Sequence, residues 1–251
     1  MLSDRIRSLG RYAAAFAVEA DGQSAAGRYT VGGDSYYLRL GDAEVYGDGR
    51  VRYEVDNRRR EVGDMVPALG SASILLAFLR HADRVKIGCM TSGLGALCAT
   101  DREHVWRTAS YYPFHQLMEY GRGQSLQVAV EGDTFDLPAY AVNDTSQYPA
   151  KEGLPYVDAA AAYDEKAGAL TLFAINRDPA GDTQIQLDVS AFEDYRFVEH
   201  LELCTPDMDA CNTWEAPDTI APAVGQSAKE EQGVVTATLK PLSWNVLRFE
   251  K

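Results

Sequence analysis

At 251 residues the chain can form one large domain or two modest ones, each with its own core. It carries 24 Lys and Arg against 37 Asp and Glu, a formal net charge of -13, which argues against binding to a nucleic-acid backbone because that requires clustered positive charge. No apolar run approaches the ~20 residues needed to cross a bilayer, so we expect no membrane partner.

Residues 1–63 are predicted to form an N-terminal helix followed by a small β-meander. Apolar side chains recur at helical spacing between residues 3 and 20, interspersed with arginines, and the helix would begin at Ser3. This charged, amphipathic start differs from the uninterrupted apolar core of a secretory signal, so a cytoplasmic protein is expected. From Gly27 onwards, short Tyr- and Val-rich runs alternate with Gly/Asp turns, which is typical of antiparallel strands.

Residues 64–122 show a helix, strand, loop, helix pattern. Pro67 suits the first turn of a helix that reaches about His81. The apolar segment 84–90 predicts a buried strand, and a second helix is expected from about His104 to Tyr120, ending at Gly121. This order is typical of the last unit of an α/β barrel.

Residues 123–251 are predicted to form a β-sandwich. Seven strand-like runs are separated by Gly, Pro and Asp, at 125–130, 156–163, 169–176, 183–189, 195–203, 234–239 and 244–249. The segments 131–153 and 216–233 are predicted to be loops.

The four cysteines are too few and too scattered for a disulfide framework, and we expect them to be reduced. Cys204 and Cys211 could close a loop, or could form a metal site with His200, but the chain has no C-x2-C pair and zinc would need a fourth ligand. The remaining two are Cys89 and Cys98. We expect neither a metal nor a cofactor.

Several motifs together resemble the C-terminal part of family 51 α-L-arabinofuranosidases. They are residues 78–123, the LPYVD run at 154–158, FAINR at 173–177, Asn212 with Thr213, and SWNV at 243–246. The resemblance covers about residues 75–251. It implies a mainly β fold with an α/β portion, in which a jelly-roll-like sandwich follows a remnant of the last (β/α)8-barrel unit. It also implies a parent reaction, the retaining hydrolysis of terminal α-L-arabinofuranosyl groups from arabinan or arabinoxylan oligosaccharides, without a cofactor.

That reaction requires two carboxyl groups, a nucleophile and a proton donor, ~5–5.5 Å apart. In the family they lie upstream of the matching region, in an Asn-Glu pair and an Asp-Glu-Trp stretch that this chain lacks. The upstream glutamates here are Glu44, Glu54 and Glu61, of which Glu54 and Glu61 are the catalytic candidates. Their surroundings are also typical of surface residues.

Three residues are candidates for substrate contacts. Thr91 and Ser92 follow the predicted strand, at the end where barrel enzymes bind substrate. The family often has a glutamine where this chain has Ser92, and both residues could equally belong to a structural turn. His104 begins an aromatic-rich segment that could stack on sugar rings or pack a helix onto a sheet.

Three functional hypotheses follow. The chain could be the C-terminal part of an intracellular arabinofuranosidase that lacks both catalytic glutamates and acts with a missing barrel-bearing chain or as a homo-oligomer. It could be a non-catalytic sandwich module for carbohydrate binding or subunit assembly. It could also be a hydrolase with a rebuilt site at Glu54 or Glu61.

Overall fold

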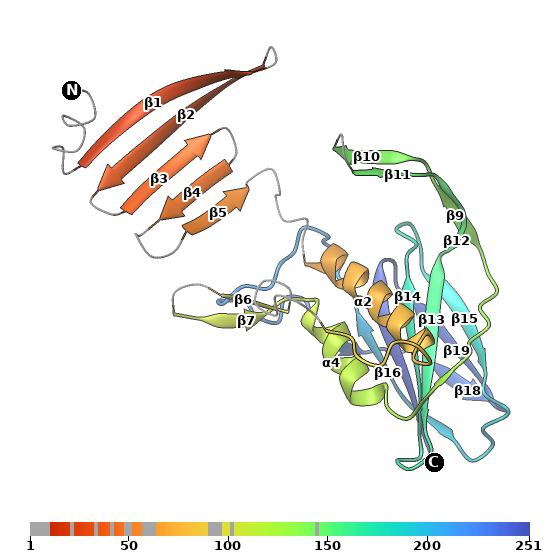
Figure 1. Cartoon of the computed structure of the whole chain (residues 1–251). Helices are drawn as coiled ribbons and strands as arrows, with labels where there is room; N and C mark the ends of the chain where they lie inside the picture. The colour runs from red at the N-terminus through yellow and green to blue at the C-terminus, as the bar shows by residue number, and fades with distance from the viewer. Residues whose placement is uncertain are drawn as a thin grey trace. The chain divides into compact units, whose positions relative to one another are not determined.

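The computed structural model shows a mainly β protein in two compact units, residues 1–61 and residues 62–251 (Figure 1). It describes residues 11–20, 23–32, 35–40, 43–47, 52–56, 64–89, 97–100, 103–143 and 146–251. Within these residues no helix combines the length and the apolarity that crossing a membrane requires.

The N-terminal unit is a five-stranded antiparallel meander in the order β1-β2-β3-β4-β5. Its strands are β1 (Arg11–Ala20), β2 (Gln23–Gly32), β3 (Ser35–Leu40), β4 (Ala43–Gly47) and β5 (Arg52–Asp56). The meander agrees with the turn pattern of the sequence.

The predicted helix over residues 3–20 is wrong for residues 11–20, which form β1; residues 3–10 lie outside the described part. The alanine-rich segment fits both the helical and the strand period, and ten residues of register with β2 decide in favour of the strand. Phe16 lies opposite Gly27, where a Cβ atom would come within 2.4 Å of the Phe16 ring. This close contact between the two strands explains the glycine.

Helix α2 (Met65–Arg80) opens the second unit and agrees with the predicted helix from Pro67 to about His81. One side of it is buried, through Met65, Ala68, Ala72, Leu75 and Leu76. The predicted strand at 84–90 is wrong for residues 84–89, which form a turn and an irregular segment; residue 90 lies outside the described part. A buried strand needs neighbours to pair with, and here Ile87 is 84% exposed.

A short hairpin of β6 (Cys98–Thr100) and β7 (Val105–Arg107) precedes helix α4 (Tyr111–Tyr120). The predicted helix start at His104 is therefore wrong by seven residues, because pairing of Val105 with Thr100 and of Arg107 with Cys98 extends the backbone. The predicted end at Gly121 is confirmed, and its N–H bonds to the Leu117 carbonyl at 2.8 Å.

A six-stranded antiparallel sheet in the order β17-β16-β20-β14-β13-β8 forms the centre of the second unit, and a three-stranded sheet in the order β15-β19-β18 packs against it. The strands of the first are β8 (Gln124–Leu126), β13 (Val157–Asp164), β14 (Ala169–Asn176), β16 (Arg196–Leu203), β17 (Ala223–Val224) and β20 (Ser243–Glu250). Those of the second are β15 (Thr183–Asp188), β18 (Lys229–Glu231) and β19 (Val234–Leu239). The predicted β-sandwich is confirmed.

The two predicted loops contain strands. Residues 131–153 hold most of two ribbons that extend from the sandwich, β9 with β12 and β10 with β11 (Figure 1). Their bounds are β9 (Thr134–Leu137), β10 (Tyr140–Asn143), β11 (Ser146–Tyr148) and β12 (Lys151–Pro155). Residues 216–233 hold β17 and β18. Strands this short do not show the periodic apolar signal that marks a longer strand.

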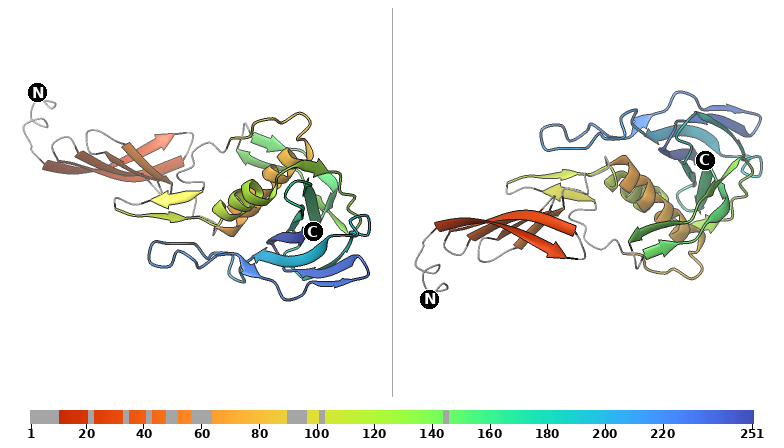
Figure 2. Two further views of the ribbon diagram at one scale, coloured as in Figure 1. Left: turned by 90° about the horizontal axis from the view of Figure 1, so that it is seen from below. Right: turned by 90° about the horizontal axis from the view of Figure 1, so that it is seen from above.

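Both faces of the six-stranded sheet are covered, and Figure 2 shows the helices and the second sheet from two further sides. On one face α2 and α4 pack on Phe173, Ile175, Trp244 and Val246. On the other, β15 and β19 pack on Leu170, Leu172, Leu247 and Phe249. This three-layer arrangement explains why β14 is buried from Leu170 to Asn176, on both of its faces.

Candidate functional site

The catalytic candidate Glu54 belongs to the N-terminal unit, and the predicted substrate contact His104 belongs to the second unit. Glu44 lies on β4 opposite Val55, and Glu54 lies on β5 opposite Val45, so neither glutamate is the direct cross-strand partner of the other. Glu61, Thr91 and Ser92 lie outside the described residues. Of the five site residues predicted from the sequence, His104 is the one whose side-chain surroundings the structure describes.

His104 stacks on Trp214, with ring centroids 4.2 Å apart and planes at 20°. Trp214 is 48% exposed, so one large aromatic surface remains open beside the histidine. Sequence reasoning missed Trp214, although it follows Asn212 and Thr213, which were singled out as family markers. We call the surface formed by His104, Trp106 and Trp214, together with the buried Asn212 that supports it, the Trp214 surface.

A loop between β16 and β17 positions Trp214, and Asn212 organises that loop. Its side chain bonds Ile220 in both directions: Oδ1 accepts from the Ile220 N–H at 2.7 Å, and Nδ2 donates to the Ile220 carbonyl at 2.9 Å. Trp106 Nε1 donates to the Asn212 carbonyl at 2.7 Å, and the Asn212 N–H donates to Asp64 Oδ2 at 3.0 Å. Asn212 therefore holds this loop to the β6–β7 hairpin and to the start of α2.

A tyrosine from α4 completes the support. The Tyr112 hydroxyl donates to Asp218 Oδ1 at 3.4 Å. Burial, and then the negative charge of Asp218, raise the pKa of Tyr112, so the phenol stays protonated and keeps donating to the loop.

The described residues of the Trp214 surface supply stacking and hydrogen bonding. Half-exposed aromatic rings suit the apolar face of a sugar or the surface of another protein. In the part of the chain with described burial, no group of three or more His, Cys, Asp or Glu side chains is placed to hold a metal ion. All four cysteines are thiols, and burial raises the pKa of Cys204.

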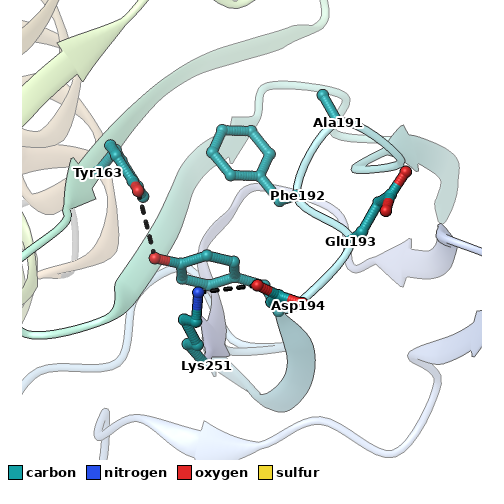
Figure 3. Close-up of a pocket in the computed structure, with 7 residues that line it drawn as sticks. Tyr163, Ala191, Phe192, Glu193, Asp194 and Lys251 are labelled. Atoms are coloured by element: carbon teal, nitrogen blue, oxygen red, sulfur yellow. Dashed lines mark hydrogen bonds and ion pairs between the residues drawn. The ribbon is translucent and has the colours of Figure 1, made fainter.

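A pocket lies at one end of the sandwich (Figure 3). It has a volume of about 380 Å³ and is lined by Tyr163, Ala191, Phe192, Glu193, Asp194, Tyr195 and Lys251. We call it the Phe192 pocket. None of its residues was predicted as a site residue, because they lie far apart in the sequence and match no catalytic spacing.

Comparison with known proteins gives a consistent family. The profile described as the α-L-arabinofuranosidase C-terminal domain matches residues 51–243, and so begins upstream of residue 75, where the resemblance was placed. An intracellular exo-α-(1→5)-L-arabinofuranosidase 1 from Bacillus subtilis is 34% identical over 189 residues, which are 73% of this chain and 35% of that protein. One from Streptomyces lividans is 32% identical over 187 residues, 73% of this chain and 26% of that protein.

Solved structures agree on the fold. A family 51 α-L-arabinofuranosidase from Bifidobacterium longum superposes with a TM-score of 0.61 at 24% identity, over 75% of this chain and 35% of that one. The enzyme from Thermotoga petrophila gives 0.65 at 19% identity, over 77% and 40%. The chain thus spans about a third of the length of relatives such as the Bacillus subtilis protein. It belongs to the α-L-arabinofuranosidase C-terminal domain family.

Proposed function

We propose that this chain is the C-terminal part of an intracellular exo-α-L-arabinofuranosidase. It would serve the hydrolysis of terminal α-L-arabinofuranosyl groups from arabinan or arabinoxylan oligosaccharides without itself supplying the two catalytic carboxylates. The family match supports this, as do relatives named intracellular exo-α-(1→5)-L-arabinofuranosidases. We further propose a cytoplasmic location and a reaction without a metal or organic cofactor.

The observation that carries the proposal is the outer side of α2. The helix has no charged residue between Met65 and Leu79. A helix that is apolar all round is normally buried all round. Here one side packs on the six-stranded sheet, while Val66 is 46% exposed, Ile74 is 52% exposed, and the space beside Gly70 is open. We infer that a barrel-bearing polypeptide covers this side of α2. Residues 64–122 would be the last unit of that barrel.

The chemistry agrees with separate roles for this chain and for the barrel-bearing polypeptide. A glycosidase needs one carboxylic acid that stays protonated near neutral pH, and burial is a common way to achieve this. Among the side chains with described burial, none of the Asp and Glu residues is buried. The described part of the chain therefore supplies packing surfaces and aromatic contacts, and the barrel would supply the acid and the nucleophile.

A second candidate function is a non-catalytic module for carbohydrate binding or subunit assembly. The stacked pair of His104 and Trp214 favours it, because a half-exposed indole can bind sugar without any carboxylate pair. This candidate predicts sugar binding with no turnover, whether or not a barrel-bearing polypeptide is present.

The decisive experiment is release of 4-nitrophenol from 4-nitrophenyl α-L-arabinofuranoside. We expect no turnover by the folded chain alone. Turnover that the double variant Glu54→Gln, Glu61→Gln loses would overturn the proposal and establish a rebuilt site. The same assay with the N-terminal two-thirds of the Bacillus subtilis relative added tests complementation. We expect Ile74→Asp to abolish any complementation, and Val198→Asp, at an exposed valine on β16, to leave it unchanged.

A further inference from the structure

The Phe192 pocket is built by three segments that meet at one end of the sandwich. Tyr163 comes from the end of β13, residues 191–195 form the connection from β15 to β16, and Lys251 follows β20 (Figure 3). A pocket of about 380 Å³ lies within the range of volumes of small-molecule sites.

Backbone hydrogen bonds hold the pocket walls in place. The Phe192 N–H donates to the Val189 carbonyl at 2.8 Å, and the Tyr195 N–H donates to the Phe192 carbonyl at 2.9 Å. Arg196 Nη1 donates to the carbonyls of Glu193, at 2.6 Å, and Tyr195, at 2.8 Å. The connection is therefore ordered before any ligand arrives, which lowers the entropic cost of binding.

The apolar wall is aromatic. The Tyr163 ring lies 5.4 Å from Phe192 and 5.9 Å from Tyr195, and Phe192 meets Tyr195 edge to face at 5.7 Å. Tyr195 is buried, while Tyr163 and Phe192 are partly exposed and border the open space. Two supported rings thus border the pocket from different segments.

The polar rim carries hydrogen-bonding capacity that the protein does not use. Lys251 Nζ donates to Asp194 Oδ2 at 2.8 Å, which leaves two of its three donors. The Glu193 carboxylate has no partner among the described residues. The Asp194 and Lys251 side chains form an ion pair, so Glu193 carries the unpaired side-chain charge of the lining. The Glu193 carboxylate disfavours an anion. A neutral ligand with hydroxyl groups can use both this acceptor and the two remaining Lys251 donors, whereas a cation can use the acceptor alone.

A neutral molecule with an apolar face and several hydroxyl groups fits these constraints. We propose that the Phe192 pocket is a non-catalytic sugar-binding site for arabinofuranosyl oligosaccharides. Phe192 covers the C–H face of one sugar ring, Glu193 accepts hydroxyl hydrogen bonds, and Lys251 donates to a ring or hydroxyl oxygen. The polyol chemistry follows from the pocket; the choice of arabinose rests on the proposed function.

The test is a ¹H–¹⁵N NMR titration of the full chain with α-(1→5)-L-arabinotriose. We expect shifts at the amides of residues 163, 191–195 and 251. Phe192→Ala should weaken binding about tenfold by removing the stacking ring, and Glu193→Gln should weaken it several-fold while keeping the shape. The matched control is Glu165→Gln, which removes an exposed carboxylate near Tyr195 that does not line the pocket. It should leave the affinity unchanged.

Three outcomes would overturn the proposal. One is no shift at 10 mM trisaccharide, a concentration at which even about millimolar affinity would be visible. Another is binding that maps to the Trp214 surface and is unaffected by Phe192→Ala. The third is preferential binding of tetramethylammonium, which would make the pocket an aromatic cage for cations. None of these readouts depends on turnover, so failure of this proposal is distinguishable from failure of the proposed function.

Discussion

Trp244 Nε1 donates a hydrogen bond to Gln116 Oε1 at 2.7 Å, between two side chains that are both buried. Trp244 lies on β20 at the centre of the six-stranded sheet, and Gln116 lies on α4. The bond therefore fixes α4 on the sheet within an interface that is mostly apolar and also holds the Arg248 guanidinium over the Tyr120 ring.

Gln116→Leu should destabilise the second unit by about 1–3 kcal/mol, because it leaves the buried indole N–H of Trp244 without an acceptor. Urea unfolding followed by tryptophan fluorescence measures the change. Met118→Ala, at an exposed position on the same helix, serves as the control and should change stability by less than about 0.5 kcal/mol. Equal effects of the two substitutions would mean that the bond does not stabilise the fold.

The central strands could be predicted from the sequence because their composition reports burial directly. The bounds predicted for 169–176 and 234–239 are those of β14 and β19. Each is an apolar or alternating run between turn residues, and a strand packed within a sandwich has this pattern.

The segments that were predicted wrongly depend on distant partners. Residues 11–20 are a strand because β2 pairs with them, and their alanine run contains no local signal that excludes a helix. Residues 84–89 have the composition of a buried strand, yet the described chain pairs no strand with them. The Trp214 surface could not be predicted because it depends on the hydrogen bonds of Asn212. The bond between Trp106 and Asn212 joins residues more than one hundred positions apart.

Asn212→Leu should destabilise the loop that carries Trp214. The substitution leaves the buried N–H and C=O of Ile220 without their side-chain partners, at about 1–3 kcal/mol for each group. Thermal unfolding and the accessibility of Trp214 to acrylamide quenching report the effect. Thr219→Ala removes an exposed hydrogen bond in the same loop and should be nearly neutral. Unchanged quenching in Asn212→Leu would contradict this role of Asn212.

Gly225→Ala should destabilise the edge of the six-stranded sheet. An added Cβ would lie 2.7 Å from Glu202 Oε2 and 2.8 Å from His200 Nδ1, and His200 is fully buried. The ring has little room to move, since its Nε2 bonds Asn245 Oδ1 at 3.0 Å. We expect a loss of about 1–3 kcal/mol, as for other overpacked sites.

Gly132→Ala is the matched control for this substitution, because an added Cβ there meets nothing within 4 Å. Denaturant unfolding of the two variants separates crowding from the general effect of replacing glycine by alanine. A Gly225→Ala variant as stable as Gly132→Ala would show that the contacts with Glu202 and His200 relax without cost.

Tyr195 should make stability depend on pH in the alkaline range. Donation of its hydroxyl to Tyr163, followed by burial, raises the pKa of Tyr195 from 10.0 to about 12. The folded state then holds the phenolic proton more tightly than the unfolded state does. This contribution to stability is complete below pH ~10 and is lost as the pH rises from ~10 to ~12. The free energy of unfolding should therefore fall more steeply over this range in the parent chain than in Tyr195→Phe. Parallel curves for the two proteins would contradict the hydrogen bond to Tyr163 as the source of the shift.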